Sequence, residues 1–176
     1  MERIGGRRTY EGRVVNIHED EFRYADGSTS VREVVVHPGA VAMIAHDERV
    51  LYLVRQPREA VGEDRLLELP AGKLDVQGES PLEAAKRELA EEIGKRATEW
   101  RELKRFYTSP GFTTEQVWLF LATDLSDVEA EPDADERIEV VEVPLEDLDG
   151  AIEDCVDAES LIGLLMLRDM RRTGDA

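Results

Sequence analysis

The sequence predicts a mixed α/β fold with an antiparallel β region at its N-terminus. Residues 9–37 mix β-branched, aromatic and polar side chains in the partial alternation that is typical of strands. Residues 81–93 read as a helix, because good helix formers dominate and no Gly or Pro follows Pro81. Further apolar strands separated by turn residues lie around this helix, and two helical segments follow them.

The composition is that of a folded, soluble protein of one globular domain. The chain has 176 residues, of which 41% are hydrophobic and 35% charged. The lone Cys155 rules out an intramolecular disulfide, and the charged N-terminus shows no signal peptide. Apolar runs are too short to cross a membrane. We therefore expect a cytoplasmic protein with no membrane partner.

The net charge of −18 argues against nucleic acid as a partner. No stripe of Lys and Arg is visible that could follow a phosphate backbone. An acidic protein that acts on an anionic phosphate compound needs a cation to screen its site.

The N-terminal β region is predicted to span residues 1–38. Asp26-Gly27 is a strong hairpin signal within it. Three short strands bury little surface alone and need a partner. The β structure is expected in residues 9–17, in residues 21–29, which contain the Asp26-Gly27 turn, and in residues 31–37.

Residues 39–176 are predicted to form the main domain. Its strands are apolar, β-branched runs bounded by turn residues, at 40–46, 50–56, 100–107 and 115–122. Two helices are expected near the end of the chain, at 144–154 and 160–172.

The helix over residues 81–93 has well-marked ends. Ser80 and Glu83 form a capping box, and Pro81 suits the first helical position. Gly94 is placed to end the helix. An apolar stripe for burial is formed by Leu82, Ala85, Leu89 and Ile93.

Three carboxylates gather beside this stripe, at Glu88, Glu91 and Glu92. Like charges at i, i+4 repel, and Arg87 offsets only part of this through Glu83 and Glu91. Oxygen ligands suit hard cations such as Mg²⁺ or Mn²⁺, so a metal site is one interpretation. A solvated acidic face is the other interpretation that the helix alone allows.

The longer stretch resembles the Nudix box, G-x5-E-x7-R-E-U-x-E-E-x-G-U, in which U is a bulky aliphatic residue. Six residues instead of five separate Gly72 from Glu79, and Lys95 replaces the last aliphatic residue. An extra loop residue is tolerable. The matching positions are Gly72, Glu79, Arg87, Glu88, Leu89, Glu91, Glu92 and Gly94.

The resemblance implies an α/β/α sandwich with a mixed sheet and a Mg²⁺-dependent hydrolase of nucleoside diphosphates, with Mn²⁺ as a possible substitute. Arg87 and Glu79 would orient the acids. The metal would be held by the backbone carbonyl of Ala71 and by Glu88, Glu91 and Glu92.

Two segments resemble the ADP-ribose pyrophosphatase branch of the family. One is RQ-x-R before the box, and the other is SPGFT-x-E beyond it. In that branch the N-terminal β region contributes to a homodimer. The substrate-binding residues that this resemblance implies are Arg55, Arg58, Glu68, Gly111 and Glu115.

By the same resemblance, an acidic loop delivers the general base. Glu136 is the best positional match, and Asp135 and Asp133 are the alternatives. The favoured reaction is hydrolysis of ADP-ribose to AMP and ribose 5-phosphate. A nucleotide-sugar or nucleoside triphosphate pyrophosphohydrolase, and a non-catalytic nucleotide sensor, are the alternative functions.

Overall fold

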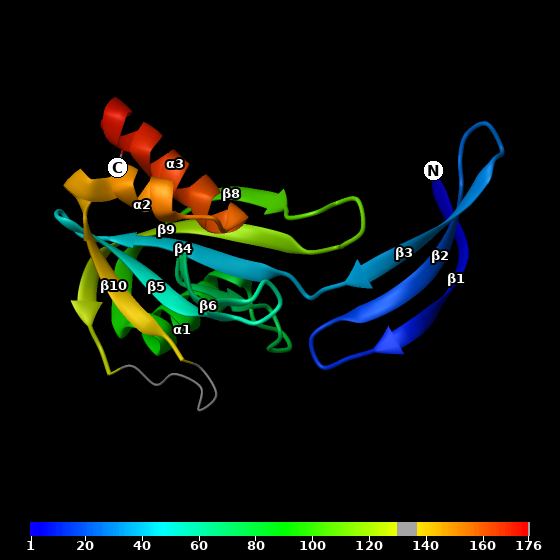
Figure 1. Ribbon diagram of the computed structural model, residues 1–176, viewed down its shortest axis with the longest axis horizontal. Helices are drawn as coiled ribbons and strands as arrows, with labels where there is room; N and C mark the ends of the chain where they lie inside the picture. Colours follow the sequence, from blue (N-terminus) through cyan, green and yellow to red (C-terminus); the bar gives the residue numbers. More distant parts are fainter. Residues whose placement is uncertain (130–136, 176) are drawn as a thin grey trace. The chain divides into compact units, whose positions relative to one another are not determined.

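The computed structural model describes residues 1–129 and 137–175. The chain forms two compact units. The first holds Met1–Gly39 and Phe106–Val117, and the second holds Ala40–Arg105 and Trp118–Ala176. Figure 1 shows the elements of both units.

The first unit is a three-stranded antiparallel sheet in the order β1-β2-β3. Val35 of β3 binds the loop before β9, since its amide donates to the Phe112 carbonyl at 2.7 Å and its carbonyl accepts from the Thr114 amide at 2.9 Å. The strands are β1 (Glu2–Glu11), β2 (Asn16–Arg23) and β3 (Thr29–Val36). Most side chains of β1 are exposed, so this sheet has little core of its own.

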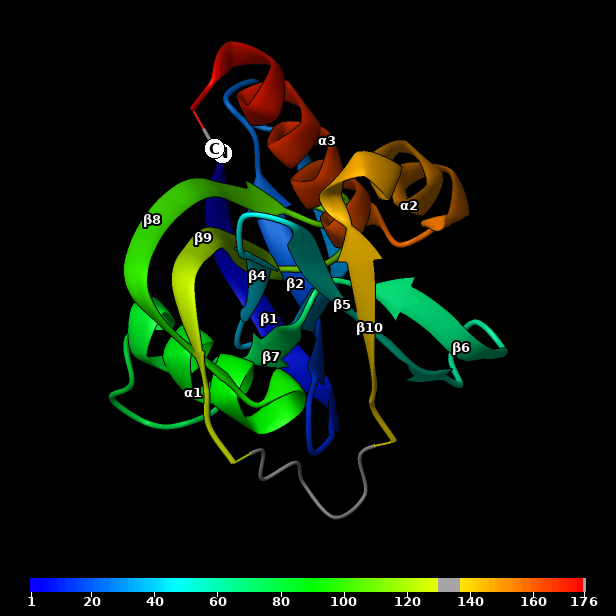
Figure 2. The same ribbon diagram turned by 90° about the vertical axis from the view of Figure 1, so that its left-hand side faces the viewer.

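The second unit is built on a seven-stranded mixed sheet in the order β10-β5-β4-β9-β8, with β6 beside β5 and β7 beside β4. Its strands are β4 (Ala40–His46), β5 (Val50–Arg58), β6 (Glu63–Glu68), β7 (Ala71–Lys73), β8 (Lys95–Tyr107), β9 (Gln116–Asp127) and β10 (Glu139–Pro144). Its helices are α1 (Pro81–Ile93), α2 (Leu148–Asp154) and α3 (Ala158–Thr173), with a 3₁₀ turn at Leu145–Asp147. Figure 2 shows α1 on one face of the sheet and α2 and α3 on the other, so the predicted α/β/α arrangement is confirmed.

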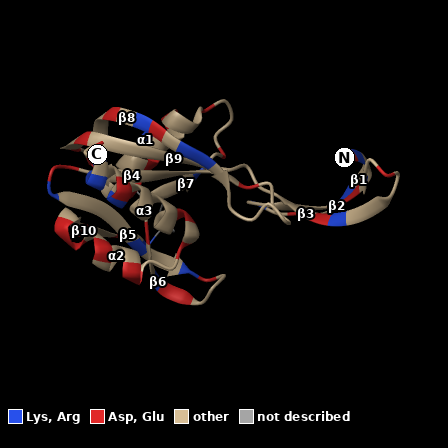
Figure 3. Ribbon diagram, turned by 90° about the horizontal axis from the view of Figure 1, so that it is seen from above, with Lys and Arg blue, Asp and Glu red and all other residues tan. Residues whose placement is uncertain are grey.

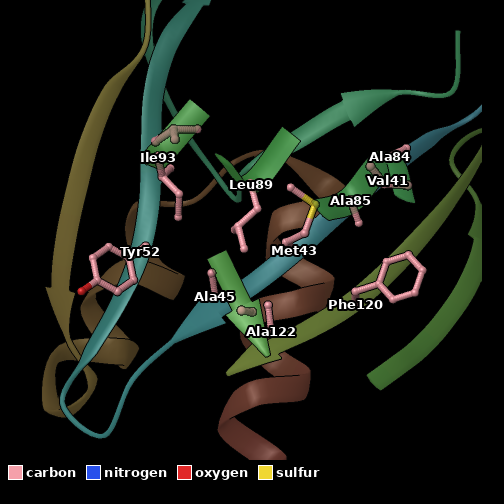
Figure 4. Packing of buried hydrophobic residues seen from close by; sticks show 12 residues of the cluster. Val41, Met43, Ala45, Tyr52, Ala84, Ala85, Leu89, Ile93, Phe120 and Ala122 are labelled. Carbon is pink, nitrogen blue, oxygen red and sulfur yellow. The ribbon is translucent and has the colours of Figure 1, made fainter. Parts of the chain in front are cut away.

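One core lies between α1 and the sheet. Leu89 and Ile93 of α1 point towards Met43 and Ala45 of β4 (Figure 4). These side chains are the apolar stripe that the helix pattern predicts. The buried members of this cluster are Val41, Met43, Ala45, Tyr52, Val54, Ala84, Ala85, Leu89, Ile93, Ala97, Phe120 and Ala122.

A second core lies between α3 and the opposite face. Because strand side chains alternate, Ile44 faces α3 where Met43 and Ala45 face α1. A Cβ added to Gly163 of α3 would lie 2.5 Å from Leu69 Cδ1 and 3.3 Å from Ile44 Cγ1. Helix α3 therefore needs Gly163 in order to approach the sheet this closely.

Strand β8 lies at an edge of the sheet, where unpaired backbone groups invite pairing with another chain. Lys and Arg positions occur along it, as the blue segments of the ribbon in Figure 3 show, while β10 and α2 carry acidic positions in red. Charged side chains of this kind discourage edge-to-edge association. The basic residues of β8 are Lys95, Arg96, Arg101, Lys104 and Arg105.

Some predicted element ends are wrong. The sequence predicts one strand over residues 9–17, whereas the chain turns there and the Gly12 amide donates to the Val15 carbonyl at 3.0 Å. No Asn-Gly or Asp-Gly pair marks this turn. The predicted turn at Asp26-Gly27 is confirmed, with Gly27 at φ +84°. In the parts of the chain that are described, no helix has the length and apolar character needed to cross a bilayer.

The turn between β4 and β5 offers a test of stability. Oδ1 of Asp47 accepts hydrogen bonds from the amides of Arg49 at 2.7 Å and Val50 at 2.8 Å. The hydrogen bond from Arg49, above all, holds the pKa of Asp47 below its ordinary value. We expect Asp47→Ala to lower the free energy of unfolding by about 1 kcal/mol at neutral pH, as measured by urea denaturation.

The sign of the pH dependence follows from the lowered pKa of Asp47. The charged form is stabilised by folding, so its contribution is present above the unfolded-state pKa of about 4 and is lost as the pH falls through the folded-state value. The difference between wild type and Asp47→Ala should therefore shrink in acid. Asp47→Asn keeps an acceptor oxygen and is the control. A difference that is equal at pH 3 and pH 7 contradicts this account.

Candidate active site

Helix α1 begins and ends as the sequence predicts. Ser80 Oγ accepts from the Glu83 amide at 3.3 Å, and the Glu83 carboxylate accepts from the Ser80 amide at 2.8 Å. Gly94 takes the left-handed conformation at φ +63°, and its amide donates to the Ala90 carbonyl at 3.1 Å. These caps fix the helix ends and so fix which side chains share a face.

Arg87 lies among three carboxylates. Its Nε and Nη2 donate to the two oxygens of Glu79, each at 3.1 Å. Its Nη1 donates to Glu88 Oε1 and to Glu91 Oε2, each at 2.8 Å. The hydrogen bonds to Glu79, before all other causes, raise the pKa of Arg87 above its usual value, so the guanidinium stays charged. The predicted pairing of Arg87 with Glu91 is confirmed, whereas Glu83, its other predicted partner, instead completes the helix cap.

Glu92 reaches from α1 to the strand before it. Glu92 is only 6% exposed, and its Oε2 accepts a hydrogen bond from the Ala71 amide at 2.9 Å. Ala71 begins β7 and pairs with Ala42 of β4. The sheet therefore places the backbone of Ala71 beside the last turn of α1.

Gly72 brings the same strand against a second carboxylate. A Cβ added to Gly72 would lie 2.0 Å from Cδ of Glu88 and 2.2 Å from its Oε1. The backbone of Gly72 is outside the left-handed region, so the glycine is needed for space and not for conformation. The Gly-rich segment thus approaches the acids of α1 at Gly72, whose backbone lies against the Glu88 side chain.

The donor atoms suit a hard divalent cation. They are the carboxylates of Glu88, Glu91 and Glu92 and the carbonyl of Ala71, which are oxygen ligands. In residues 1–129 and 137–175, no three His, Cys, Asp or Glu side chains are gathered closely enough to hold a metal ion. Arg87 binds two of these carboxylates, Glu88 and Glu91, and the Ala71 amide binds the third, Glu92. The donors fit such a cation chemically, because all of them are oxygen ligands.

A second charged cluster lies at the end of β5 and β6. Arg58 donates from Nε and Nη2 to the two oxygens of Glu68, each at 2.8 Å, and Gln56 Nε2 donates to Glu68 at 2.9 Å. Glu68 is buried, while the Arg58 side chain is 43% exposed. Burial lowers the pKa of Arg58, but the hydrogen bonds and charge of Glu68 outweigh it, so the net pKa is raised.

The other predicted substrate-binding residues, Arg55, Gly111 and Glu115, are not hydrogen-bonded to the Arg58–Glu68 pair within the described part of the chain. Arg55 Nη1 donates to the Arg65 carbonyl at 3.2 Å on the surface of the second unit. Gly111 and Glu115 belong to the first unit. There Glu115 accepts from Thr108 Oγ1 at 2.6 Å. Their roles towards a substrate stay predictions.

The candidate base Glu136 lies outside the described residues, as do its alternatives Asp133 and Asp135. The assignment of the general base to this acidic loop is therefore based on the sequence pattern alone.

Comparison with known proteins decides the family. The NUDIX domain matches residues 36–161, which is well over half of the chain. The chain belongs to the Nudix family. The matched span contains α1, its acids and the whole of the Ala71–Lys73 strand.

Individual relatives of this Nudix protein agree with that result. An ADP-ribose pyrophosphatase of Bacillus subtilis is 44% identical over 82% of this chain and 78% of the relative. A methanol dehydrogenase activator of Bacillus methanolicus is 42% identical over 78% of this chain and 75% of the relative. A crystal structure of an ADP compounds hydrolase superposes with a TM-score of 0.86 and 25% identity, over 99% of this chain and 96% of that one. The chain is a Nudix pyrophosphohydrolase that cleaves nucleotide pyrophosphates.

The two departures from the Nudix box have structural explanations. The extra loop residue lies in an exposed turn, in which the Glu79 amide donates to the Val76 carbonyl at 3.2 Å. Lys95 packs where an aliphatic residue is usual, with its Nζ 4.6 Å from the centre of the Tyr52 ring and 2.5 Å from Asp127 Oδ1. The cation–π contact with Tyr52 and the ion pair with Asp127 hold the Lys95 side chain at this position.

Sequence reasoning missed two residues near the site of this Nudix hydrolase. Gln56 binds the buried Glu68, and Ser160 Oγ accepts from the Leu69 amide at 2.8 Å. The Q of RQ-x-R was a signal for Gln56. The Asp157-x-x-Ser160 spacing at the start of α3 is a recognisable signal for the helix cap. No local pattern, however, predicts the hydrogen bond between Ser160 and Leu69.

Proposed function

We propose that this Nudix hydrolase cleaves the pyrophosphate bond of ADP-ribose, giving AMP and ribose 5-phosphate, with Mg²⁺ as its cofactor and Mn²⁺ as a substitute. The observation that carries the reaction is the set of oxygen donors that β7 and α1 bring together around Ala71, Glu88 and Glu92. The relative named ADP-ribose pyrophosphatase, at 44% identity, supports the substrate. Nudix hydrolases are in general dependent on divalent metals.

The carboxylates of Glu88, Glu91 and Glu92 and the carbonyl of Ala71 would hold the cation. A bound Mg²⁺ supplies Lewis acidity towards the phosphates and lowers the pKa of a bound water. Arg87, fixed by its two hydrogen bonds to Glu79, keeps Glu88 and Glu91 on the same side of α1. Its charge limits the repulsion between these carboxylates when no cation is bound.

Water adds its oxygen to one phosphorus while the bridging P–O bond breaks, and the proton lost by the water goes to a base. From the sequence pattern we assign this role to Glu136. The other phosphate leaves with the bridging oxygen. The net reaction consumes one water molecule and yields two phosphate monoesters.

We assign substrate contacts to Arg55, Arg58, Glu68, Gly111 and Glu115. The support for Arg58 is its bidentate pairing with the buried Glu68, which fixes the plane of the guanidinium. A guanidinium held in one plane loses less freedom when it binds a phosphate.

A substrate panel tests the proposed activity. ADP-ribose, GDP-mannose, 8-oxo-dGTP and diadenosine polyphosphates are compared with Mg²⁺ and with Mn²⁺. We expect ADP-ribose to have the highest kcat/KM. Phosphorus NMR in ¹⁸O-labelled water shows which phosphorus the water attacks. If another compound has the higher kcat/KM, that compound replaces ADP-ribose as the proposed substrate. If the protein turns over none of the compounds, the result favours a non-catalytic nucleotide sensor.

A second candidate function comes from the relative named methanol dehydrogenase activator, which is 42% identical to this chain. That similarity is nearly as high as the one to the ADP-ribose pyrophosphatase. Purified protein is therefore added to a methanol dehydrogenase assay. A rise in dehydrogenase rate that a Glu92→Gln variant does not produce supports this function and links it to the hydrolytic site.

We also propose that the protein is a cytoplasmic homodimer joined through residues 1–38, a region distinct from the Nudix domain at 39–176. The support is the three-stranded sheet with exposed apolar side chains, including Tyr10 at 56% and Val31 at 59%. Such a sheet gains stability when another surface covers it.

Sedimentation tests the dimer. We expect the full chain to sediment as a dimer at micromolar concentration, and Val31→Asp to shift it towards monomer because a buried carboxylate is costly. Val156→Asp is the matched control, since Val156 is exposed in the segment between α2 and α3 of the second unit and lies outside the proposed interface. A wild-type protein that is monomeric at this concentration refutes the proposal.

A further inference from the structure

The start of α3 binds the segment that leads into the candidate active site. Asp157 caps this helix, because its Oδ2 accepts from the Ser160 amide at 2.9 Å. Ser160 is only 1% exposed, and its Oγ accepts from the Leu69 amide at 2.8 Å. The cap therefore fixes a buried hydroxyl on a backbone amide two residues before Ala71.

The segment Leu69–Pro70–Ala71 is held at three consecutive residues. Ser160 binds the amide of Leu69, the Pro70 carbonyl accepts from the Met43 amide at 2.9 Å, and the Ala71 amide donates to Glu92 at 2.9 Å. Proline also fixes one of the two soft dihedrals at the middle position. The backbone amide that Ser160 holds therefore lies in the same short anchored segment as Ala71 and the Glu92 carboxylate that Ala71 binds.

Helix α3 touches the same segment a second time. A Cβ on Gly163 would lie 2.5 Å from Leu69 Cδ1. Leu69 is fully buried, so its side chain yields only by displacing the neighbours that it packs against. Ser160 thus holds the backbone of Leu69, and the lack of a side chain at Gly163 leaves room for the Leu69 side chain.

We propose that Ser160 is a positioning residue for the metal-binding groups: with Gly163 it fixes the segment 69–71, so that the Ala71 carbonyl and the Glu92 carboxylate are presented together. This inference rests on the proposed function, because it assumes that these groups hold the cation. Outer hydrogen-bond partners of metal ligands typically change metal affinity by about 10–100-fold. Ser160 acts through the backbone and touches no reacting atom.

The test is Mn²⁺ binding to the substrate-free protein, measured by electron paramagnetic resonance as the loss of the free-ion signal. We expect Ser160→Ala to weaken Mn²⁺ binding by about tenfold and to raise the metal concentration for half-maximal activity by the same factor. Gly163→Ala disturbs Leu69 by a different route and should have the same effect. Should Ser160→Ala not fold, Ser160→Cys, which keeps the volume with a weaker acceptor, takes its place.

Asp47→Ala is the matched control. It removes hydrogen bonds from backbone amides in the β4–β5 turn and should leave Mn²⁺ binding unchanged. Wild-type protein that does not bind Mn²⁺ refutes the proposed function itself. Wild-type protein that binds it, with Ser160→Ala and Gly163→Ala binding equally well, overturns only the role of Ser160.

Discussion

Replacing Glu92 with glutamine is expected to abolish metal-dependent turnover while the fold survives. The Glu92 carboxylate is buried and accepts the Ala71 amide hydrogen bond at 2.9 Å. A glutamine amide oxygen can accept the same hydrogen bond, so the contact between α1 and β7 is kept. It carries no charge, however, and an amide is a far weaker ligand for Mg²⁺ than a carboxylate. We expect kcat to fall by at least about a hundredfold, since even outer partners of metal ligands cost up to that factor.

The measurement for Glu92→Gln is the steady-state rate over a Mg²⁺ titration, with thermal unfolding of the same sample. Glu83→Gln is the matched control, because it makes the same change on the same helix at a residue that serves the cap. Its rate should remain close to that of the wild type. A Glu92→Gln protein that keeps metal-dependent turnover would remove Glu92 from the site and with it the main support for the catalytic assignment.

Helix α1 shows what the sequence can predict. Its start, its end and its buried stripe depend on residues within one or two turns of one another, such as Ser80 with Glu83 and Gly94 with Ala90. Local hydrogen bonds and periodic burial are enough to define them. The acids at Glu88, Glu91 and Glu92 are then located by counting along the helix. For the same reason the Nudix box could be recognised from its spacing alone.

Contacts between distant residues could not be predicted in this way. Ser160 is 91 positions from Leu69, and the contact exists because α3 packs on one face of the sheet while β7 lies beside β4. The pairing of Arg58 with Glu68 needs the register of β5 on β6. The first contact depends on the order of elements in the sheet, and the second depends on a register shift between Gln56 and Arg58.

The N-terminal strands illustrate a third limit. The sequence predicts one strand over residues 9–17, and the turn at Gly12 was missed because a Val-Val pair follows it and suggests a continuous strand. β-propensity describes a half-buried surface, and most side chains of this sheet are not buried within the described unit. Where burial is weak, the pattern that marks strand ends is weak as well.

Gly72→Ala is expected to inactivate the enzyme from a position that carries no functional group. The new Cβ would lie 2.0 Å from Glu88 Cδ, and real Cβ contacts are never that short. The Glu88 carboxylate is the end of a flexible side chain, so it moves and the backbone does not have to. We expect metal binding and kcat to fall by about a hundredfold, the upper end of the loss typical when a partner of a metal ligand is changed, with little change in the unfolding midpoint.

Gly150→Ala is the matched control for this change, because, apart from its chain neighbours and the backbone of its own helix, no described residue has an atom within 4 Å of the position of its Cβ in α2. Alanine is the better helix former, so this variant should be slightly more stable and fully active. If Gly72→Ala lost stability and activity together, the glycine would be needed for packing in general. Loss of Mn²⁺ binding in a protein of unchanged stability would show instead that the space beside Gly72 is reserved for the Glu88 carboxylate, and that catalysis depends on where this one carboxylate is held.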